Sequence, residues 1–412
     1  MNMSKMITFV AVAASAAIPM AANADTIEIN GVVWTYVVNN ATAKTVTLGG
    51  GTASTLAMAT DTAFDAAVIP WTFDVDGETY TVTAIAAQAF NGCTKLTGTL
   101  TIPMAVTSIG RAALQNTGLE HIASLGGVTS LNGYVFEKSQ SLTQAFPDIS
   151  RVTSFLQRGV FYGSKFSGTA YIGKNASISP DRTFASCSNL EGICAPGPDA
   201  VVSGTQTYTT INVGLFAESS TNMKVIFFGP NTKGDTMTNG TALRNVTGCK
   251  VYVPANGYWD GLVAGGIDTD VVYYGASTNL DLSVDTDLRV TVTTPTDGDG
   301  LVKALEAAPL FKTHFGWNTH ICVTNTIDLT DVTITEDMVS GATFDRLMFS
   351  AKTQTQLNAI LGAFPATTPI SIDPTGLTEN MVIPETYANV FVKTVPGVTI
   401  KRTTKGFMII VK

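Results

Sequence analysis

The sequence has little charge and few histidines or cysteines. Only 14% of its 412 residues are Asp, Glu, Lys or Arg, against about a quarter in an ordinary soluble protein, while 45% are hydrophobic. This balance excludes a charge-driven disordered chain and a coiled coil. The 24 Lys and Arg against 32 Asp and Glu give a net charge of -8. A nucleic-acid partner is not expected, because phosphate binding needs clustered cations.

The scarcity of ligating residues also narrows the chemistry. With five cysteines, none in a C-x-x-C pair, at least one lacks an intramolecular partner, so neither a disulfide framework nor a structural zinc site is expected. His314 and His320 lie six residues apart and share no helical face. The sequence holds no G-x-S-x-G, H-E-x-x-H, P-loop or G-x-G-x-x-G motif. We therefore predict no metal, no cofactor and no catalytic centre.

One acidic stretch suggests calcium at first sight. An EF-type loop that began at Asp297 would need an oxygen ligand at its fifth position and Glu at its twelfth, which are Leu301 and Ala308. The calcium interpretation therefore fails. We interpret the glycine-rich stretch as a turn in which Asp299 caps the helix that follows.

Long hydrophobic runs are missing except at the start. Lys5 precedes an apolar stretch over residues 7–18, which is too short for a bilayer span of about 20 residues. Ala22 and Ala24 then supply the small residues that a signal peptidase reads. We predict a signal peptide over residues 1–24, cleavage after Ala24, no later membrane span, and a secreted or cell-surface protein.

A sequence unit recurs through the first two-thirds of the chain. Val82-Thr-Ala-Ile85, Val106-Thr-Ser-Ile109 and Val128-Thr-Ser-Leu131 are each followed five residues later by a large apolar residue. These large residues, here called the anchors, are Phe90, Leu114, Phe136, Phe161, Phe184, Phe216 and Leu243. Their spacing is about 22 to 27 residues, with one longer interval, which is typical of a solenoid of stacked repeats.

A short β-type segment follows each anchor. These segments include Leu100-Thr-Ile102, Ala170-Tyr-Ile172, Ile226-Phe-Phe228 and Val251-Tyr-Val253. Several end at a proline, which stops strand pairing. One unit cannot bury its apolar face alone, so stacked units are expected to bury Phe, Ile and Leu in a continuous ladder.

The unit resembles the BspA-type leucine-rich repeat, whose pattern is approximately L-x-x-I-x-I-P-x-x-V-x-x-I-G-x-x-A-F-x-x-C. Residues 99–110 and Ala89-Phe-Asn-Gly-Cys93 match it, and residues 29–36 look like the strand that leads into such arrays. The resemblance covers residues 28–275. It implies a curved solenoid outside a bacterial cell, used for adhesion or protein recognition and without catalysis. Cys93 and Cys187 hold the same repeat position and are interpreted as buried thiols.

The pattern changes beyond Tyr274. Tyr258 and Trp259 are interpreted as the aromatic cap of the last repeat. Helix candidates then cover residues 301–308 and 354–364, the second behind a capping box at 353–356, among short strand candidates. The predicted fold is a β-rich leucine-rich-repeat solenoid with one short strand per repeat, followed by a small α+β domain. Its divisions are a lead-in and capping β segment over 25–78, the solenoid over 79–275, and the α+β domain over 276–412.

The repeated strand offers a candidate binding surface. Strand residues alternate faces, so Thr101 points outward when Leu100 and Ile102 point inward. The same register predicts one exposed line across the sheet: Thr101, Ser124, Ala145, Tyr171, Cys194, Phe227 and Tyr252. We predict ligand binding at Thr101, Ser124, Tyr171, Phe227 and Tyr252, because aromatic residues are favoured at recognition surfaces. The alternative is that aromatic residues merely suit strands, or that the C-terminal domain covers them.

Three functions are compatible with these features. The leading hypothesis is a non-catalytic surface protein that binds a protein or glycan partner through the exposed face of the solenoid. The second is a structural component of the envelope, in which the same sheet makes self-contacts. The third is an enzyme within residues 276–412, which would need a pocket of convergent polar groups.

Overall fold

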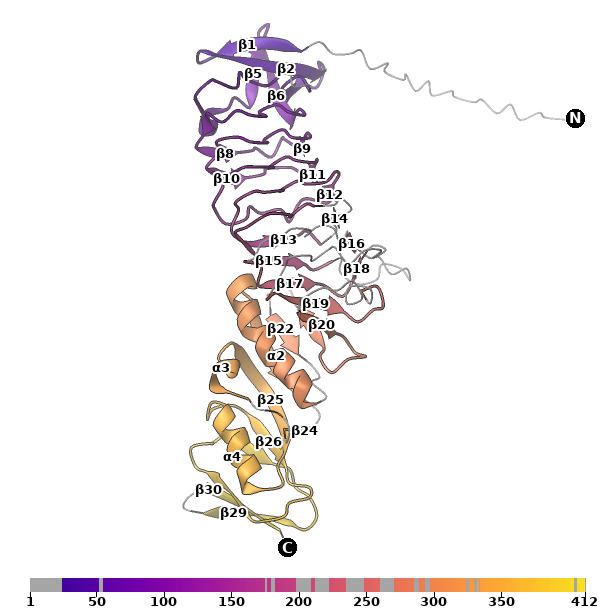
Figure 1. Ribbon diagram of the computed structural model, residues 1–412, viewed down its shortest axis with the longest axis vertical. Helices are drawn as coiled ribbons and strands as arrows, with labels where there is room; N and C mark the ends of the chain where they lie inside the picture. Colours follow the sequence, from indigo (N-terminus) through magenta and orange to yellow (C-terminus); the bar gives the residue numbers. More distant parts are fainter. Residues whose placement is uncertain are drawn as a thin grey trace, which may run out of the picture.

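The computed structural model describes most of the chain after the predicted signal peptide. The described residues are 24–51, 55–174, 176–178, 182–197, 209–211, 222–234, 248–259, 270–284, 289–292, 297–323, 326–329, 332, 334–403 and 406–411. Residues 1–23 of the predicted signal peptide and the anchors Phe216 and Leu243 lie outside them. The protein is rich in strands, has few helices, and forms an elongated column from β1 to β30 (Figure 1).

One sheet of 11 strands follows the column from its N-terminal end. Its order is β1 (Asp25–Ile29), β2 (Val32–Asn40), β3 (Thr45–Leu48), β6 (Glu78–Ile85), β9 (Ser108–Ile109), β11 (Ser130–Leu131), β12 (Ser154–Phe155), β14 (Ser177–Ile178), β16 (Thr209–Ile211) and β18 (Thr232–Gly234), with β5 (Thr72–Val75) beside β6. From β3 onward this order is parallel. Each Ser-apolar dipeptide pairs with the equivalent dipeptide of the next repeat. The sequence prediction of one strand per repeat missed this second set of strands.

The strands that follow the anchors form two further parallel sheets. β8 (Thr99–Thr101) pairs with β10 (His121–Ser124), and a separate sheet has the order β13 (Gly168–Tyr171), β15 (Leu190–Ala195), β17 (Val225–Phe228), β19 (Lys250–Pro254) and β20 (Asp270–Tyr274). β4 (Phe64–Asp65) pairs with β7 (Leu96–Thr97), and η1 (Ala66–Val68) follows β4. The predicted β segments at these positions are confirmed, whereas the one predicted at residues 144–146 forms only an isolated bridge, from Ala145 to Ser167.

The anchors form the core between the sheets. Phe90, Leu114, Phe136, Phe161 and Phe184 all have no exposed surface. The rings of Phe136 and Phe161 stack with centroids 5.4 Å apart, and those of Phe161 and Phe184 with centroids 5.5 Å apart. Stacked aromatic rings add attraction to the burial of apolar area, so each repeat stabilises its neighbour.

A left-handed turn surrounds each anchor. The residues two before and two after the anchor have positive φ in successive repeats: Gln88, Ala112, Tyr134, Gly159 and Arg182 before it, and Gly92, Asn116, Lys138, Gly163 and Ser186 after it. The anchor N–H donates to the carbonyl before the next anchor, as from Phe90 to Ala113 at 2.8 Å and from Phe136 to Val160 at 2.8 Å. These hydrogen bonds satisfy backbone groups that would otherwise be buried without partners.

Glycine in the I-G pair has a packing reason. A Cβ atom built on Gly110 would lie 2.3 Å from the backbone nitrogen of Ala87 in the preceding coil. No side chain fits at that distance, so the coils approach each other closely only because the residue is glycine.

Two tryptophans pack near the ends of the repeats. Trp34 on β2 is fully buried, with its ring 5.1 Å from Phe64 and 6.5 Å from Phe90, the first anchor. Trp259 is also fully buried and stacks on Phe228 at 4.4 Å. Its indole N–H donates to the carbonyl of Thr232 at 3.2 Å. The parallel sheet runs one strand further, to β20.

The last part of the chain builds another, largely parallel sheet. Its order is β21 (Leu282–Val284), β22 (Arg289–Val292), β23 (Asn318–Cys322), β25 (Ala342–Ser350), β26 (Ile370–Asp373) and β28 (Val390–Val392), with β24 (Ile327–Asp328) beside β25. β27 (Met381–Pro384), β30 (Gly406–Val411) and β29 (Val398–Thr403) form a small antiparallel sheet. Leu347, Ile370 and Val390 are in register, so this ladder also advances by roughly one repeat length per strand.

Helices connect these parallel strands. α2 (Gly298–Leu310) and the π-helical turn η3 (Phe311–Phe315) lie between β22 and β23, α3 (Glu336–Val339) precedes β25, and α4 (Gln354–Ala363) joins β25 to β26. Parallel neighbours need such crossovers, so the arrangement is closer to α/β than to the α+β predicted. Asp297, not Asp299, caps α2: its carboxylate accepts the Gly300 N–H at 2.8 Å. Among the described residues, no helix is both long and apolar enough to cross a membrane.

Candidate functional site: the outward line of the repeat sheet

The backbone register of the predicted line is observed in two blocks. Thr101 pairs with Ser124 across β8 and β10. Tyr171, Cys194, Phe227 and Tyr252 pair in succession across β13, β15, β17 and β19. The predicted continuity between the blocks is wrong, because Ala145 forms an isolated bridge to Ser167 and not to Tyr171. Outward side chains therefore form two separate rows.

The first row is open to solvent. Thr101 and Ser124 are exposed, as are Ala123 and His121 on the same strand. Tyr171, at the start of the second row, is 39% exposed. These three predicted positions, Thr101, Ser124 and Tyr171, present polar groups and one aromatic ring at the surface. Their prediction as ligand-binding residues stays a prediction.

The rest of the second row is buried, which corrects the prediction that it is exposed. Cys194, Phe227 and Tyr252 are 2%, 1% and 0% exposed. The ring of Phe227 lies 5.1 Å from Trp317 and 5.9 Å from Phe311, and that of Tyr252 lies 4.8 Å from Phe311. Residues 298–317 therefore cover this end of the sheet, so Phe227 and Tyr252 belong to a core and not to a free binding surface.

The local sequence explains the shape of the covering segment, defined as residues 298–317. α2 carries Pro309 near its C-terminal end, and the chain continues through the π-helical turn to Gly316, whose φ of 68° ends it in the left-handed conformation. The turn brings Phe311, Phe315 and Trp317 together, with Phe315 and Trp317 centroids 4.8 Å apart. Their clustered rings make the apolar surface that the sheet buries.

Polar contacts fix the covering segment at the edges of this apolar core. The Thr169 hydroxyl donates to the carbonyl of His314 at 2.6 Å, and the Tyr171 hydroxyl donates to the same oxygen at 3.4 Å. At the other edge, the Lys250 ammonium donates to Glu306 on α2 at 2.7 Å and to Asp270 at 2.6 Å. Directional contacts at both edges set one orientation of the segment.

Burial shifts two pKa values at this boundary. Desolvation lowers the pKa of His314, opposed by the charge of Glu191 at 3.5 Å and reinforced by Lys224. Burial, with a smaller contribution from Cys194, raises the pKa of Tyr171 to about 12. Both groups are therefore neutral at pH 7, which suits side chains that border an apolar core.

The close fit extends to a glycine on the sheet. A Cβ atom on Gly192 of β15 would lie 3.3 Å from the Phe315 ring and 3.5 Å from the Cβ of His314. The absence of a side chain at this position lets the π-helical turn lie directly on the strand.

A groove of about 260 Å³ lies beside Ser124 in the exposed row. Met104, Pro147, Asp148 and Arg151 line it together with Ser124. Met104 is 61% exposed, and an Arg151 guanidinium nitrogen lies 3.7 Å from its sulfur. The groove thus combines an exposed apolar side chain with one charge of each sign.

One structural residue beside this row was not identified from the sequence. The Gln144 side-chain amide accepts the Ile122 N–H at 2.6 Å and donates to the Ile122 carbonyl at 3.0 Å. It thereby pairs with β10 as a neighbouring strand would. A glutamine at a strand position of its repeat could have indicated this side-chain pairing.

The described residues hold no group of three or more His, Cys, Asp or Glu side chains placed to bind a metal. His320 contacts Asp345 at 3.1 Å, apart from His314 and its partner Glu191. Burial raises the pKa of both Cys93 and Cys187 to about 11, so these thiols are poor nucleophiles, as the prediction of buried thiols implied.

The comparison with protein families supports the repeat assignment. Residues 78–196 match the family described as BspA type Leucine rich repeat region, in six copies. This span contains β6, β9, β11, β12 and β14 of the long sheet and both rows of outward strands as far as β15. No curated protein matches the sequence.

Several solved structures are similar to the chain at low identity. A leucine-rich repeat protein from Bacteroides ovatus is 15% identical, with 90% of this chain and 88% of that one covered and a TM-score of 0.31. A leucine rich cell surface protein from Faecalibacterium prausnitzii is 13% identical, with 63% and 97% covered and a TM-score of 0.27. A leucine-rich repeat protein from Eubacterium ventriosum is 13% identical, with 93% and 100% covered and a TM-score of 0.28.

Proposed function

We propose that this chain is a non-catalytic binding protein that recognises a protein or a glycan outside the cell. The support is the match of residues 78–196 to the BspA-type leucine-rich repeats. In this proposal the repeats form a solenoid, and the partner contacts its exposed outward row at Thr101 and Ser124, with Tyr171 at the margin. Phe227 and Tyr252 are not part of the proposed site, because the covering segment buries both side chains.

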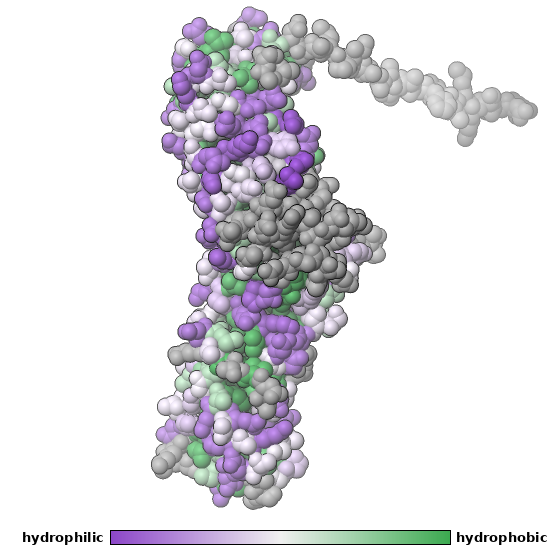
Figure 2. Space-filling view, viewed as in Figure 1, coloured by the Kyte–Doolittle hydropathy of each residue, from purple (hydrophilic) through white to green (hydrophobic). Residues whose placement is uncertain are grey.

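The observation that carries the proposal is the contrast between the two rows. The aromatic row is buried against residues 298–317, whereas the Thr101–Ser124 row is exposed and adjoins the groove of Met104 and Arg151. Recognition surfaces combine an apolar contact with polar groups at its margin, as this groove does. The part of the repeat surface that Figure 2 shows in colour is mainly hydrophilic to intermediate.

The test is binding of purified residues 25–412 to arrays of glycans and extracellular proteins. A double variant, Thr101→Arg with Ser124→Arg, places two long charged side chains in the exposed row. The matched control is Thr107→Arg with Thr129→Arg, which alters exposed residues beside the second set of strands and adds the same charge.

A partner whose affinity falls at least tenfold in the first variant and not in the second supports the proposal. Equal binding by both variants and the unmodified chain would contradict it. Self-association in place of partner binding, measured by sedimentation, would favour a structural role in the envelope.

Export of the chain is a further part of the proposal. Its support is the sequence of residues 1–24, where an apolar stretch precedes Ala22 and Ala24. The check is the N-terminal sequence of the protein recovered from the medium or cell surface, which is expected to begin at Asp25.

A further inference from the structure

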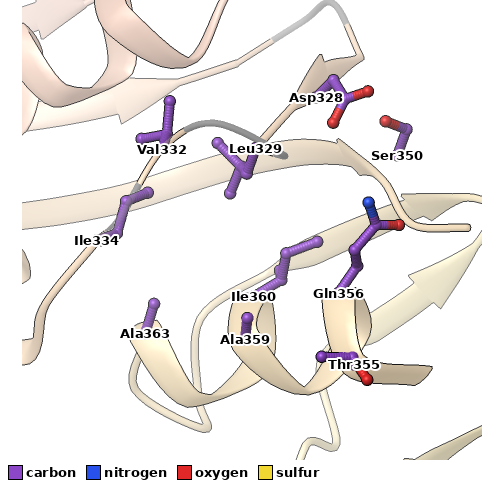
Figure 3. A pocket seen from close by; sticks show the side chains of 10 residues that line it. All are labelled: Asp328, Leu329, Val332, Ile334, Ser350, Thr355, Gln356, Ala359, Ile360 and Ala363. Atoms are coloured by element: carbon purple, nitrogen blue, oxygen red, sulfur yellow. The ribbon is translucent and has the colours of Figure 1, made fainter. Parts of the chain in front are cut away.

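A cavity of about 350 Å³ lies between α4 and the ends of β24 and β25, in the C-terminal part of the chain (Figure 3). It opens where two parallel strands end. Asp328 is the last residue of β24 and pairs with Ser350, the last residue of β25. α4 begins four residues after Ser350, and its first turn supplies Gln356 to the same cavity. Ligands of α/β proteins bind at this position, at the carboxyl ends of the strands.

The cavity has an apolar wall and a polar end. Leu329, Val332 and Ile334 face Ile360 of α4, and Figure 3 shows these side chains on one side of the cavity with Asp328, Ser350 and Gln356 at the other. Ile360 is 3% exposed, so this part of the wall is fixed by the core. The cavity volume falls in the range of small-molecule sites and suits a ligand of about ten non-hydrogen atoms.

The polar end supplies two groups with acceptor oxygens, the carboxylate of Asp328 and the hydroxyl of Ser350, beside the side-chain amide of Gln356. The Gln356 amide oxygen accepts the Lys352 N–H at 2.8 Å, which fixes the orientation of the amide. The amide nitrogen of Gln356 is drawn on the side of Asp328 and Ser350 in Figure 3.

The ammonium of Lys352 makes a weak contact with Asp328 at this end. The Lys352 ammonium is 3.8 Å from Asp328, and the two side chains are 52% and 50% exposed. An exposed pair at that separation contributes little. A ligand ammonium can therefore compete with Lys352 for the carboxylate, because the Lys352 pair itself contributes little.

We propose that this pocket binds a small amphiphilic amine, with its ammonium group at Asp328 and Ser350 and its aliphatic body against Leu329, Val332 and Ile360. This binding is independent of the recognition proposed for the repeat surface. The carboxylate selects a cationic head over a neutral or an anionic one, and the aliphatic wall accepts the tail.

The experiment uses the full mature chain and three probes that share one tail: n-hexylamine, 1-hexanol and hexanoate. Titrations are followed by two-dimensional NMR of the isoleucine methyl groups, where Ile360 reports the pocket directly. We expect saturable shifts with hexylamine, at least fivefold weaker binding of hexanol, and at least tenfold weaker binding of hexanoate. No saturable binding of hexylamine, or equal affinity for hexylamine and hexanoate, would overturn the proposal.

Variants on one helix separate pocket binding from general effects. Ala359 lines the cavity yet is exposed, so Ala359→Trp fills the space without overpacking the core. Gly362→Trp is the matched control, because a Cβ atom there meets nothing within 4 Å and the residue does not line the cavity. Hexylamine binding is expected to fall at least tenfold in Ala359→Trp alone. Retention of full affinity in a folded Ala359→Trp protein would contradict the site.

The charge assignment has its own variant. Asp328→Asn keeps the size of the side chain and removes the negative charge. It is expected to reduce hexylamine binding at least fivefold, to the level of hexanol, while hexanol binding stays within twofold. An unchanged preference for the amine would show that Asp328 is not its partner.

Discussion

Individual residues in the repeats adopt a conformation that their type disfavours. The position two after the anchor has positive φ whether it is glycine, as in Gly92 and Gly163, or another residue, as in Asn116, Lys138 and Ser186. A Cβ atom in the left-handed region clashes with the following carbonyl, at a cost of roughly 1 to 2 kcal/mol. The repeat retains the turn there because its N–H groups hydrogen-bond the next coil, as Lys138 does to Tyr162 at 3.1 Å.

Replacement of Lys138 by glycine is therefore expected to stabilise the protein. Lys138 is exposed and has φ 59°, so Lys138→Gly removes the Cβ strain without opening a cavity. Part of this gain is offset by the greater freedom of glycine in the unfolded chain. The free energy of unfolding is therefore expected to rise by about 0.5 to 1 kcal/mol. Urea unfolding measures it, with Lys138→Ala as the control that keeps the Cβ atom. Equal stability of the two variants would contradict the strain argument.

His314 makes the stability of the protein depend on pH, because it lies where the covering segment packs on the repeat sheet. Its folded pKa is lowered by burial, so the unfolded chain binds the proton more tightly than the folded one. This contribution to stability is present above the unfolded value of about 6.5 and is lost as the pH falls through it towards the lower folded pKa. We expect a lower thermal midpoint at pH 5.5 than at pH 7.5, with a smaller difference in His314→Gln. The exposed His121→Gln variant should keep the difference of the unmodified protein.

At the scale of elements, the sequence predicted the repeats better than their cover. Equivalent positions recur in each repeat, so the repeat spacing predicts that Tyr171 to Tyr252 pair in succession. The structure confirms this register. The contact of Thr169 with His314 joins residues 145 apart and has no period to reveal it. The residue types could have indicated the cover. The outward line changes from Thr and Ser to Phe and Tyr where residues 298–317 bury it.

The C-terminal elements show a second limit of the sequence prediction. Helix candidates at 301–308 and 354–364 correspond to α2 and α4, because caps and apolar spacing are local signals. The parallel order of β22, β23, β25 and β26 depends on pairing between distant strands, which local signals do not carry. The pocket at Asp328 and Ser350 depends on that order and was not foreseen for the same reason.

The covering segment can be loosened at one residue. Trp317 contacts Phe227, Phe311 and Phe315, so Trp317→Ala is expected to cost about 3 to 5 kcal/mol of packing and to open the segment locally. Cys194 lies in the same core, whereas Cys187 lies in the repeat core. Alkylation followed by mass spectrometry should therefore accelerate at least tenfold at Cys194 and stay slow at Cys187. Equal rates at Cys194 with and without Trp317 would contradict the role of the segment as its cover.

At the scale of the whole molecule, the buried residues form two large cores, and one of them takes residues from both sides of position 275. One core fills the repeats from Val32 to Trp259. The other unites Phe227 and Tyr252 of the repeat sheet with Leu305, Phe311 and most of the buried residues that follow. Residues 298–317 therefore cover one end of the repeat sheet, as the alternative of a covering C-terminal domain described, while the domain division at residue 275 stays a prediction.

Removal of that part is expected to change how the repeats behave in solution. A chain ended at Gly275 would expose Val225, Phe227 and Tyr252 together, an apolar patch of the kind that drives association. Sedimentation velocity should show association with increasing concentration beyond that of the full mature chain. Phe227→Ser with Tyr252→Ser in the shortened chain should reduce this association, because the patch becomes polar while Phe136 and Phe161 in the repeat core are untouched. If the shortened chain remains folded and associates no more than the full chain, the patch at Val225, Phe227 and Tyr252 does not drive association. That result would contradict the conclusion that residues 298–317 shield an apolar surface from solvent.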